Sequence, residues 1–306
     1  MPELAALRLD LKVGFACNNR CDFCAQGDKR RVLPRRTLTE IATALREAAS
    51  RGVTGVVFTG GEPTLHPDLP RAVRAARLMG FQSVQIQTNG RRLAYRSYCE
   101  TLREAGVTEF SPSLHGSRAS IHDGLTHAPG AWRQVVRGLL NLRQLGLPAI
   151  LNTVVTAANF HDLPDLARLF VRAGVSQFQF AFVHIVGTAA QDPRRVVPSK
   201  SEAMPYILEG LRVGRAGGVS CYTEAIPLCL LPGVEDRASE RLIPDGPVLD
   251  HGVHLESWEA WRVGQGKAKR EACRGCRWDP VCEGPWKEYP ELFGWDEFAP
   301  VPKEAA

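Results

Sequence analysis

The feature that most constrains the fold of this chain is the regular alternation of short β-branched or aromatic runs with amphipathic stretches. Six runs fit strands, at residues 9–15, 55–59, 83–87, 109–114, 149–155 and 177–182. The stretches between them place apolar residues on one helical face, as Ile41, Ala44, Leu45 and Ala48 do in residues 39–51. Strands that alternate with helices form βα units around a parallel sheet. The pattern therefore predicts an α/β fold in which six units build a partial (β/α)6 barrel.

The predicted helices also carry the signals that begin and end helices. Thr37 or Thr39 can cap the first of them, because a threonine side chain accepts a hydrogen bond from the free N–H groups of a first turn. Four further helices are expected at residues 69–78, 95–104, 132–145 and 163–172, each followed by a glycine: Gly80, Gly106, Gly146 and Gly174. Glycine in that place closes a helix in the left-handed conformation.

A second region is expected to begin near residue 190, because the βα alternation stops after residue 187. Residues 192–199 resemble a proline-containing linker, and 201–214 predict a helix. Prolines at 227, 232, 244 and 247 then interrupt the chain. We expect a barrel domain over residues 1–190 and a small loop-rich domain over 191–306. A bound metal is expected to stabilise this second domain.

Nine cysteines accompany an N-terminal stretch, residues 1–10, that does not resemble a secretory signal, and no run of apolar residues is long enough to span a membrane. This predicts a cytoplasmic protein with no membrane partner. Cytosolic thiols stay reduced, so metal ligation is expected rather than disulfides. Six of the cysteines form two sets, Cys17, Cys21 and Cys24 near one end and Cys273, Cys276 and Cys282 near the other.

The net charge is small. The chain has 38 basic and 33 acidic residues, a formal charge of +5, which is far below that of a dedicated nucleic-acid binder. The densest basic patch, defined as Lys29, Arg30, Arg31, Arg35 and Arg36, follows the first cysteine set. It fits either a solvated loop or a surface that attracts an anionic substrate or partner.

The first cysteine set lies in the segment CNNRCDFC, directly after the first predicted strand. Active sites of parallel barrels gather at this end of the strands. Three thiolates in one loop can hold three irons of a [4Fe–4S] cube and leave the fourth iron open. A zinc ion bound by the three cysteines with His66 or water is the alternative, although structural zinc sites favour paired CxxC segments.

Short polar residues end the other predicted strands on the same side. TGGEP follows the second strand, with Gly60, Gly61, Glu62 and Pro63. Adjacent glycines let a backbone approach a ligand closely, and Glu62 or a carbonyl can accept from an ammonium group. A glycine pair after a strand is also an ordinary turn. The remaining strand-end residues are Thr88 and Asn89, Ser113 with Leu114 and His115, and Asn152 with Thr153.

The spacing CxxxCxφC, with aromatic Phe23 before the third cysteine, resembles the signature of the radical SAM superfamily. The resemblance implies a TIM-like partial barrel whose cluster, bound by Cys17, Cys21 and Cys24, is chelated by S-adenosylmethionine (SAM). Reductive cleavage of SAM would then give a 5′-deoxyadenosyl radical.

The same resemblance implies roles for the strand-end residues. TGGEP would receive the amino group of SAM, with Thr88 and Asn89 near it. Ser113 and Asn152 would hold the ribose or the carboxylate, and Phe23 and the region near Val183 would pack around adenine. The sequence singles out no catalytic acid or base: Glu224, Asp279 and Tyr289, like His115, His122 and His184, fit structural roles as well as substrate contact.

The second cysteine set has the spacing CxxCx5C, which resembles the core of the SPASM and twitch extensions of radical SAM enzymes. The longer SPASM pattern has a further cysteine where this chain has Trp286. We expect one auxiliary [4Fe–4S] cluster in a twitch-like domain, bound by Cys273, Cys276, Cys282 and either Cys229, which is preferred, or Cys221. A structural zinc with the same ligands is the alternative. The aromatic residues of this tail predict a small core around the metal.

Together these features predict an enzyme that abstracts hydrogen from an unreactive C–H bond. The expected substrate is a peptide or natural-product precursor, or alternatively a small metabolite, and the expected partner is a reducing protein such as flavodoxin or ferredoxin. A metal-binding regulator without catalysis is the hypothesis of another class. RNA modification has no RNA-binding motif to support it.

Overall fold

The computed structural model describes residues 7–303, so the first six residues of the N-terminal stretch lie outside the described residues. The strands are β1 Arg8–Gly14, β2 Gly55–Gly60, β3 Ser83–Thr88, β4 Glu109–Pro112, β5 Ile150–Val155, β6 Gln177–Phe182, β7 Ser220–Glu224, β8 Val248–Leu249 and β9 His254–Leu255. The helices are α1 Lys29–Val32, α2 Leu38–Ser50, α3 Leu69–Leu78, α4 Arg96–Ala105, α5 Ala119–Thr126, α6 Ala131–Gln144, α7 Leu163–Ala173, α8 Pro193–Val196, α9 Lys200–Ala216, α10 Trp258–Trp261 and α11 Glu288–Phe293.

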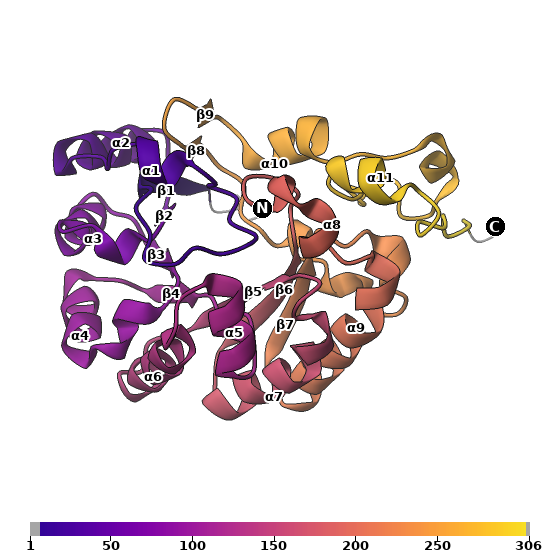
Figure 1. Cartoon of the computed structure of the whole chain (residues 1–306). Coiled ribbons are helices and arrows are strands. Elements are labelled where there is room, and N and C mark those ends of the chain that lie inside the picture. The colour runs from indigo at the N-terminus through magenta and orange to yellow at the C-terminus, as the bar shows by residue number, and fades with distance from the viewer. Residues whose placement is uncertain (1–6, 304–306) are drawn as a thin grey trace.

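The strands form a mostly parallel sheet that curves around an interior space (Figure 1). One part has the order β4-β3-β2-β1-β8-β9 and the other β5-β6-β7. Parallel bridges from Phe110 to Ala149 and from Ser113 to Asn152 join β4 to β5. All six predicted strands are present within two residues of the expected ends, and the predicted α/β fold with a parallel sheet is confirmed.

A seventh parallel strand continues the alternation beyond the point where the sequence indicated its end. β7 pairs in register with β6, from Gln177 opposite Ser220 to Ala181 opposite Glu224, and α9 connects the two strands. The expectation that the alternation stops after residue 187 is therefore wrong. The short polar β7, SCYTE, lacks the apolar run that marks a buried parallel strand, which is why it was missed.

The helices α2, α3, α4, α6, α7 and α9 lie along the outer side of the sheet (Figure 1). Thr37 caps α2, accepting from the Glu40 N–H in a capping box, so of the two threonines Thr37 is the cap. The four glycines expected after helices all have positive φ, from 67° at Gly146 to 108° at Gly106. The hydrophobic core fills the layer between these helices and the strands.

The C-terminal region returns to the free side of β1. The backbone of residues 245–249 pairs with β1, where Arg8 N donates to Asp245 O and Asp10 N to Pro247 O, both at 2.9 Å. α10 and α11 then lie beyond β8 and β9, at the side of the molecule away from α2–α4 (Figure 1). Residues 245–249 therefore pair with the edge of β1 that would otherwise have free backbone N–H and C=O groups.

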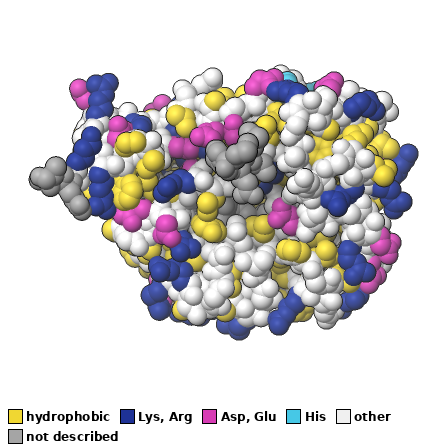
Figure 2. Space-filling model, turned by 180° about the vertical axis from the view of Figure 1, so that it is seen from behind, with side chains coloured by type: hydrophobic (Ala, Val, Ile, Leu, Met, Phe, Trp, Pro, Cys, Tyr) yellow, Lys and Arg dark blue, Asp and Glu magenta, His cyan; other side chains and the backbone are white. Residues whose placement is uncertain are grey.

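No helix within residues 7–303 has the length and apolar character needed to cross a membrane. On the face shown in Figure 2, lysines and arginines are spread among acidic, apolar and neutral side chains. This distribution agrees with the small net charge of +5.

Candidate functional site

The loop that carries Cys17, Cys21 and Cys24 leaves the carboxyl end of β1 and is tied to two distant parts of the chain. Its backbone bonds the end of α5, where Arg20 N donates to Thr126 O at 2.8 Å. These contacts fix a segment that has no regular secondary structure of its own. The three thiols are all partly exposed.

The segment after β6 holds the other end of this loop. The carbonyl of Cys24 accepts from the Thr188 N–H and from the Thr188 hydroxyl, both at 3.0 Å. Gly187 passes so close that a Cβ there would lie 2.2 Å from the same carbonyl oxygen, and its φ of 59° also favours glycine. The loop after β6 and the loop after β1 are therefore packed backbone against backbone around the third cysteine.

The chemistry of the three thiols fits a cationic cluster. Burial raises the pKa of Cys17, and burial together with the neighbouring thiols of Cys17 and Cys24 raises that of Cys21. Thiols that oppose one another's ionisation in this way are stabilised as thiolates by a bound metal, which supplies the missing positive charge. The donor set, three cysteines of one loop, fits three irons of a [4Fe–4S] cluster.

Gly60 and Gly61 of TGGEP allow β2 to end against the cysteine loop. A Cβ on Gly60 would lie 2.1 Å from the Gly14 carbonyl oxygen, and one on Gly61 would lie 2.1 Å from that of Phe15. Gly61 N donates to Gly14 O at 2.8 Å. These glycines thus let the end of β2 pack closely against the segment that leads into the cysteines. Pro63 then begins a short 3-10 turn, Pro63–Leu65.

Glu62 connects this turn to the end of β3. Its side chain is 3% exposed, and its carboxylate accepts four hydrogen bonds, from Thr64 N at 3.0 Å, Thr64 Oγ1 at 2.5 Å, Thr88 Oγ1 at 2.6 Å and Asn89 N at 2.6 Å. Burial raises the pKa of Glu62, while these donors oppose the shift. The carboxylate therefore holds TGGEP and Thr88–Asn89 together as one unit, while an incoming ammonium would have to compete with four donors already in place.

Asn89 faces the cysteine loop from this unit. Its Nδ2 lies 3.8 Å from Cys17 Sγ and donates to Asn18 Oδ1 at 2.6 Å. The structure thus brings the first cysteine, TGGEP and the end of β3 to one place. An amide N–H directed at a thiolate stabilises its negative charge, so Asn89 would also influence a cluster held by Cys17.

The residues expected around SAM lie on the same side of the sheet. Ser113 and Asn152 form the parallel bridge between β4 and β5, and both are partly exposed. Phe23, 9% exposed, packs its ring edge against His115 with the centroids 4.6 Å apart. Their roles toward SAM stay predictions.

His115 and His122 are buried, neutral side chains. His115 Nδ1 accepts from Val154 N at 3.2 Å, and His122 Nδ1 accepts from the His115 N–H at 3.0 Å. Burial lowers the pKa of His115 and lowers that of His122 to about 4. Both rings therefore carry their proton on Nε2 and support the wall on which Phe23 packs.

A central cavity of about 680 Å³ lies inside the curve of the sheet. Alternate residues of several strands point into it, among them Arg8, Asp10 and Lys12 of β1, Gln85 and Gln87 of β3, Asn152 of β5, Gln177 and Gln179 of β6, and Tyr222 and Glu224 of β7. Ala25 and Gln26, directly after Cys24, line it as well. The cavity thus extends from the interior of the sheet to the cysteine loop, and its size suits a small ligand.

Charged side chains in this cavity are largely paired. Lys12 Nζ lies 3.3 Å from both Asp10 carboxylate oxygens and 3.4 Å from the Thr59 hydroxyl. Glu224 accepts from Gln179 Nε2 at 2.7 Å, and burial together with the nearby Glu240 carboxylate raises the pKa of Glu224. The lining therefore offers hydrogen-bonding groups with little net charge.

The basic patch is mostly engaged within the chain. Lys29 pairs with Asp250 at 2.6 Å, and Arg36 donates to the Asp250 and Lys12 carbonyls, both at 3.0 Å. Arg30 donates to the Asn19 carbonyl at 3.1 Å. These contacts attach α1 and the following loop to the C-terminal tail and to the cysteine loop.

The second set of thiols gathers around a small separate pocket. Its lining includes Cys229, Cys273, Cys276 and Cys282 together with Trp278, Trp295 and Phe298. Burial raises the pKa of Cys229 to about 12, and the thiols of the other three cysteines add to the effect. Cys221 instead lies in the core, where its Sγ contacts the Leu211 carbonyl oxygen at 3.4 Å. Cys229, and not Cys221, thus shares a pocket with the three downstream cysteines.

The aromatic tail reaches from this pocket back to the central cavity. The Trp286 ring stacks on His184, with centroids 4.0 Å apart, and His184 lines the cavity. His184 Nε2 also lies 3.3 Å from a Glu288 carboxylate oxygen. Within residues 7–303 no three His, Cys, Asp or Glu side chains converge on a single-ion site, so both thiol sets are defined here by a shared loop or pocket.

The model of the radical SAM superfamily matches residues 11–170, which is more than half of the chain and includes the cysteine loop, TGGEP and the end of β3. The chain belongs to the radical SAM superfamily. Membership of this superfamily implies a [4Fe–4S] cluster and SAM, and the first cysteine set fits such a cluster.

Two curated relatives each match somewhat more than half of the chain. The chain is 30% identical to the AdoMet-dependent heme synthase of Oleidesulfovibrio alaskensis over 190 residues, 62% of this chain and 48% of the relative. It is 31% identical to the GTP 3′,8-cyclase of Aquifex aeolicus over 179 residues, 56% of this chain and 55% of the relative. The chain therefore spans about half the length of these two relatives.

Among solved structures, anSMEcpe with bound AdoMet and Kp18Cys peptide superposes with a TM-score of 0.64. The match covers 98% of this chain and 92% of that one, at 16% sequence identity. A likeness at this identity concerns the fold alone. It includes the C-terminal region as well as the sheet.

The alternation of polar and apolar residues in β1 and β6 is a sequence signal for the central cavity. Strands of a parallel sheet are buried on both faces and are normally apolar throughout. β1 reads RLDLKVG and β6 reads QFQFAF, so polar or small residues occupy every second position. That alternation marks a polar interior, and it identifies the cavity-lining side chains of both strands.

Proposed function

We propose that this radical SAM enzyme abstracts a hydrogen atom from a C–H bond of a substrate held in the central cavity. The observation that carries the proposal is the lining of this cavity, which runs from the polar strand positions to Ala25 and Gln26, next to Cys24. When bound by Cys17, Cys21 and Cys24, the cluster together with SAM would supply a 5′-deoxyadenosyl radical. The frame would be the partial barrel expected over residues 1–190, which we extend to include α9 and β7 because β7 pairs with β6 and lines the cavity.

The residues of the chain orient the substrate and keep water out. The Lys12–Asp10 pair and the Glu224–Gln179 pair provide fixed hydrogen-bonding groups in the cavity lining. Trp258 and Trp261, stacked with centroids 5.1 Å apart, form part of its apolar wall. A radical intermediate needs such shielding, because stray hydrogen donors would quench it.

We favour a peptide or another amide-rich natural-product precursor as the substrate. Five side-chain amides line the cavity, those of Gln85, Gln87, Gln177, Gln179 and Asn152. Some of their groups are engaged within the chain, as Gln179 Nε2 is with Asn152 and Glu224, but an amide carries both a donor and an acceptor, as a peptide backbone requires. The solved anSMEcpe structure carries a peptide with AdoMet. A small metabolite is the second candidate, which the GTP 3′,8-cyclase among the relatives favours.

The hydrogen abstraction is tested with anaerobically reconstituted protein, SAM and dithionite. We expect formation of 5′-deoxyadenosine, and a peptide deuterated at its reacting carbon should transfer deuterium into that product. Because the abstracted hydrogen is carried into 5′-deoxyadenosine, a library of deuterated peptides and small metabolites can be screened by the mass increase of 5′-deoxyadenosine alone. Absence of 5′-deoxyadenosine from protein with an intact cluster would contradict the proposal.

We further propose that the part of residues 191–306 that follows β7 forms a twitch-like domain with one auxiliary [4Fe–4S] cluster, since α9 and β7 extend the sheet. Cys229, Cys273, Cys276 and Cys282 share one pocket, whose wall includes Trp278, Trp295 and Phe298. Four thiolates complete the ligands of such a cluster, which suits it to electron transfer. The stacked Trp286 and His184 lie between this pocket and the cavity.

Cys229→Ala is expected to remove the auxiliary cluster, lowering iron from about eight to about four atoms per chain. Cys221→Ala is the matched control, since Cys221 lies in the core near Leu211, and it should keep all the iron. Iron, sulfide and zinc analysis with Mössbauer spectra provides the measurement. Unchanged iron together with an unchanged Mössbauer spectrum in Cys229→Ala would reject Cys229 as a ligand. About four irons with one zinc in the wild-type protein would make the site a structural zinc site.

A further inference from the structure

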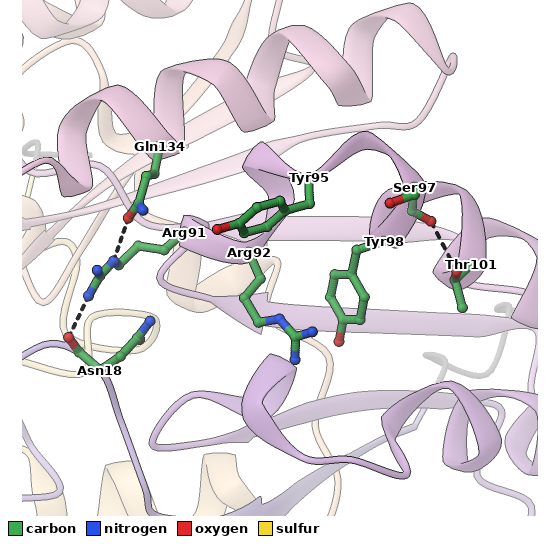
Figure 3. A pocket seen from close by; sticks show the side chains of 8 residues that line it. All are labelled: Asn18, Arg91, Arg92, Tyr95, Ser97, Tyr98, Thr101 and Gln134. Atoms are coloured by element: carbon green, nitrogen blue, oxygen red, sulfur yellow. Dashed lines mark hydrogen bonds between the residues drawn. The ribbon is translucent and has the colours of Figure 1, made fainter.

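A second hollow, of about 650 Å³, lies on the outside of the sheet, next to the cysteine loop (Figure 3). We call it the outer groove, lined by Asn18, Arg91, Arg92, Tyr95, Ser97, Tyr98, Thr101 and Gln134. These residues come from the loop, from the 3-10 turn Arg91–Ala94, from α4 and from α6. None of them lines the central cavity. A molecule in the outer groove therefore leaves the cavity free for substrate.

The wall of the outer groove is part of the cysteine loop. Asn18 follows Cys17 directly in the sequence and is exposed. Arg91 fixes it, with Nη1 donating to the Asn18 carbonyl at 2.5 Å and to Asn19 Oδ1 at 3.2 Å, while its Nε donates to Gln134 at 2.6 Å (Figure 3). Asn18 is also bonded to Asn89, which contacts Cys17 Sγ at 3.8 Å. A partner in the groove thus lies one residue from a cluster ligand.

The outer groove is cationic and aromatic. Its lining holds two guanidinium groups and no carboxylate. Arg92 stacks on the Tyr98 ring at 4.2 Å and donates to the Thr64 carbonyl at 2.6 Å, so its charge is fixed at the surface (Figure 3). Tyr95 is 62% exposed, and Leu65, which adjoins Thr64, is 36% exposed. Arginine and tyrosine are the residues that protein interfaces favour at their centres.

These arginines suit a protein surface better than a small anion. Arg91 already makes three hydrogen bonds within the chain, and Arg92 is held by a carbonyl and a ring. Neither presents the free planar fork with which arginine grips a phosphate or carboxylate. Their positive field still attracts an acidic surface, and complementary charge speeds the encounter of two proteins.

We propose that the outer groove is the docking site of an acidic electron-donor protein of the flavodoxin type. The inference rests on the proposed function, because only a redox cluster behind Cys17 requires an electron there. The partner would contact Tyr95 and Arg92 and deliver its electron to the side of the cluster next to Asn18. Substrate and donor would then bind to separate parts of the molecule.

Binding of a recombinant acidic flavodoxin to the anaerobically reconstituted enzyme tests the proposal. Tyr95→Ala and Arg92→Glu are each expected to raise the dissociation constant at least tenfold, and higher salt should weaken the wild-type complex. The matched control is the double variant Arg172→Glu and Arg215→Glu. Both residues are exposed and lie at the ends of α7 and α9 that lead into β6 and β7, at the opposite edge of the sheet.

A parallel assay separates this inference from the proposed function. With dithionite as reductant, Tyr95→Ala should cleave SAM as fast as wild type, whereas with reduced flavodoxin its rate should fall about tenfold. Equal flavodoxin affinity in wild type and both groove variants would overturn the docking site, as would wild-type protein that does not bind flavodoxin. Loss of SAM cleavage with dithionite in wild type would instead overturn the proposed function, while the affinities still decide where the donor binds.

Discussion

Cys21→Ala is expected to abolish SAM cleavage and to remove about four irons per chain, leaving the auxiliary site filled. Cys21 sits between the other two thiols, which both act on its ionisation, so its loss leaves two ligands where a cluster needs three. We expect 5′-deoxyadenosine formation to fall to the background of enzyme-free controls, a loss of at least a thousandfold. Iron and sulfide analysis and a 5′-deoxyadenosine assay measure the two effects.

Cys99→Ala is the matched control for this prediction. Cys99 is fully buried in α4, where its Sγ contacts the Leu93 carbonyl oxygen at 3.3 Å, and it belongs to neither thiol set. It should keep both the iron and the activity. Retention of the full iron content by Cys21→Ala would show that the first cysteine set is not the cluster site.

Gly61→Ala is expected to destabilise the protein by roughly 3 kcal/mol or more and to reduce iron incorporation. The new Cβ would lie 2.1 Å from the Phe15 carbonyl oxygen and 2.6 Å from that of Ala16, and backbone atoms cannot move aside as a side-chain end can. The strand end must therefore separate from the loop that carries Cys17. Urea unfolding followed by circular dichroism gives the free energy, and metal analysis gives the occupancy.

Gly124→Ala provides the comparison. Gly124 lies in α5, and a Cβ there meets nothing within 4 Å. Because alanine restricts the unfolded chain and favours a helix, this variant should be stabilised by about 0.5 kcal/mol. If Gly61→Ala unfolded at the same urea concentration as wild type, the close packing of β2 against the cysteine loop would be refuted.

The role of Glu62 shows how far a motif alone can be interpreted. The sequence TGGEP predicts that Glu62 or a backbone carbonyl accepts from an ammonium group, and this role stays a prediction. In the structure the carboxylate accepts four hydrogen bonds from Thr64, Thr88 and Asn89. The donors come from β3 and from the adjoining turn, and their convergence depends on the pairing of β2 with β3, which the local sequence does not contain.

The chain's secondary structure and its chemical class follow from local sequence. Apolar periodicity, the Thr37 cap and the glycines after helices predict the six strands and the helices between them, since these signals act over a few residues. The spacing of Cys17, Cys21 and Cys24 predicts a cluster loop, because all three ligands lie within the single short segment CNNRCDFC. These features require no knowledge of distant contacts.

Tertiary structure alone decided which distant groups meet. It added β7 to the sheet, brought Cys229 into one pocket with the three downstream cysteines, and placed Arg91 against Asn18 to form the outer groove. Tertiary structure also decided the hydrogen bond from Thr188 to the Cys24 carbonyl and the close packing of Gly187 against that carbonyl. Such contacts join residues tens to more than a hundred positions apart, and their geometry is fixed by sheet register and helix packing, which single-sequence patterns do not specify.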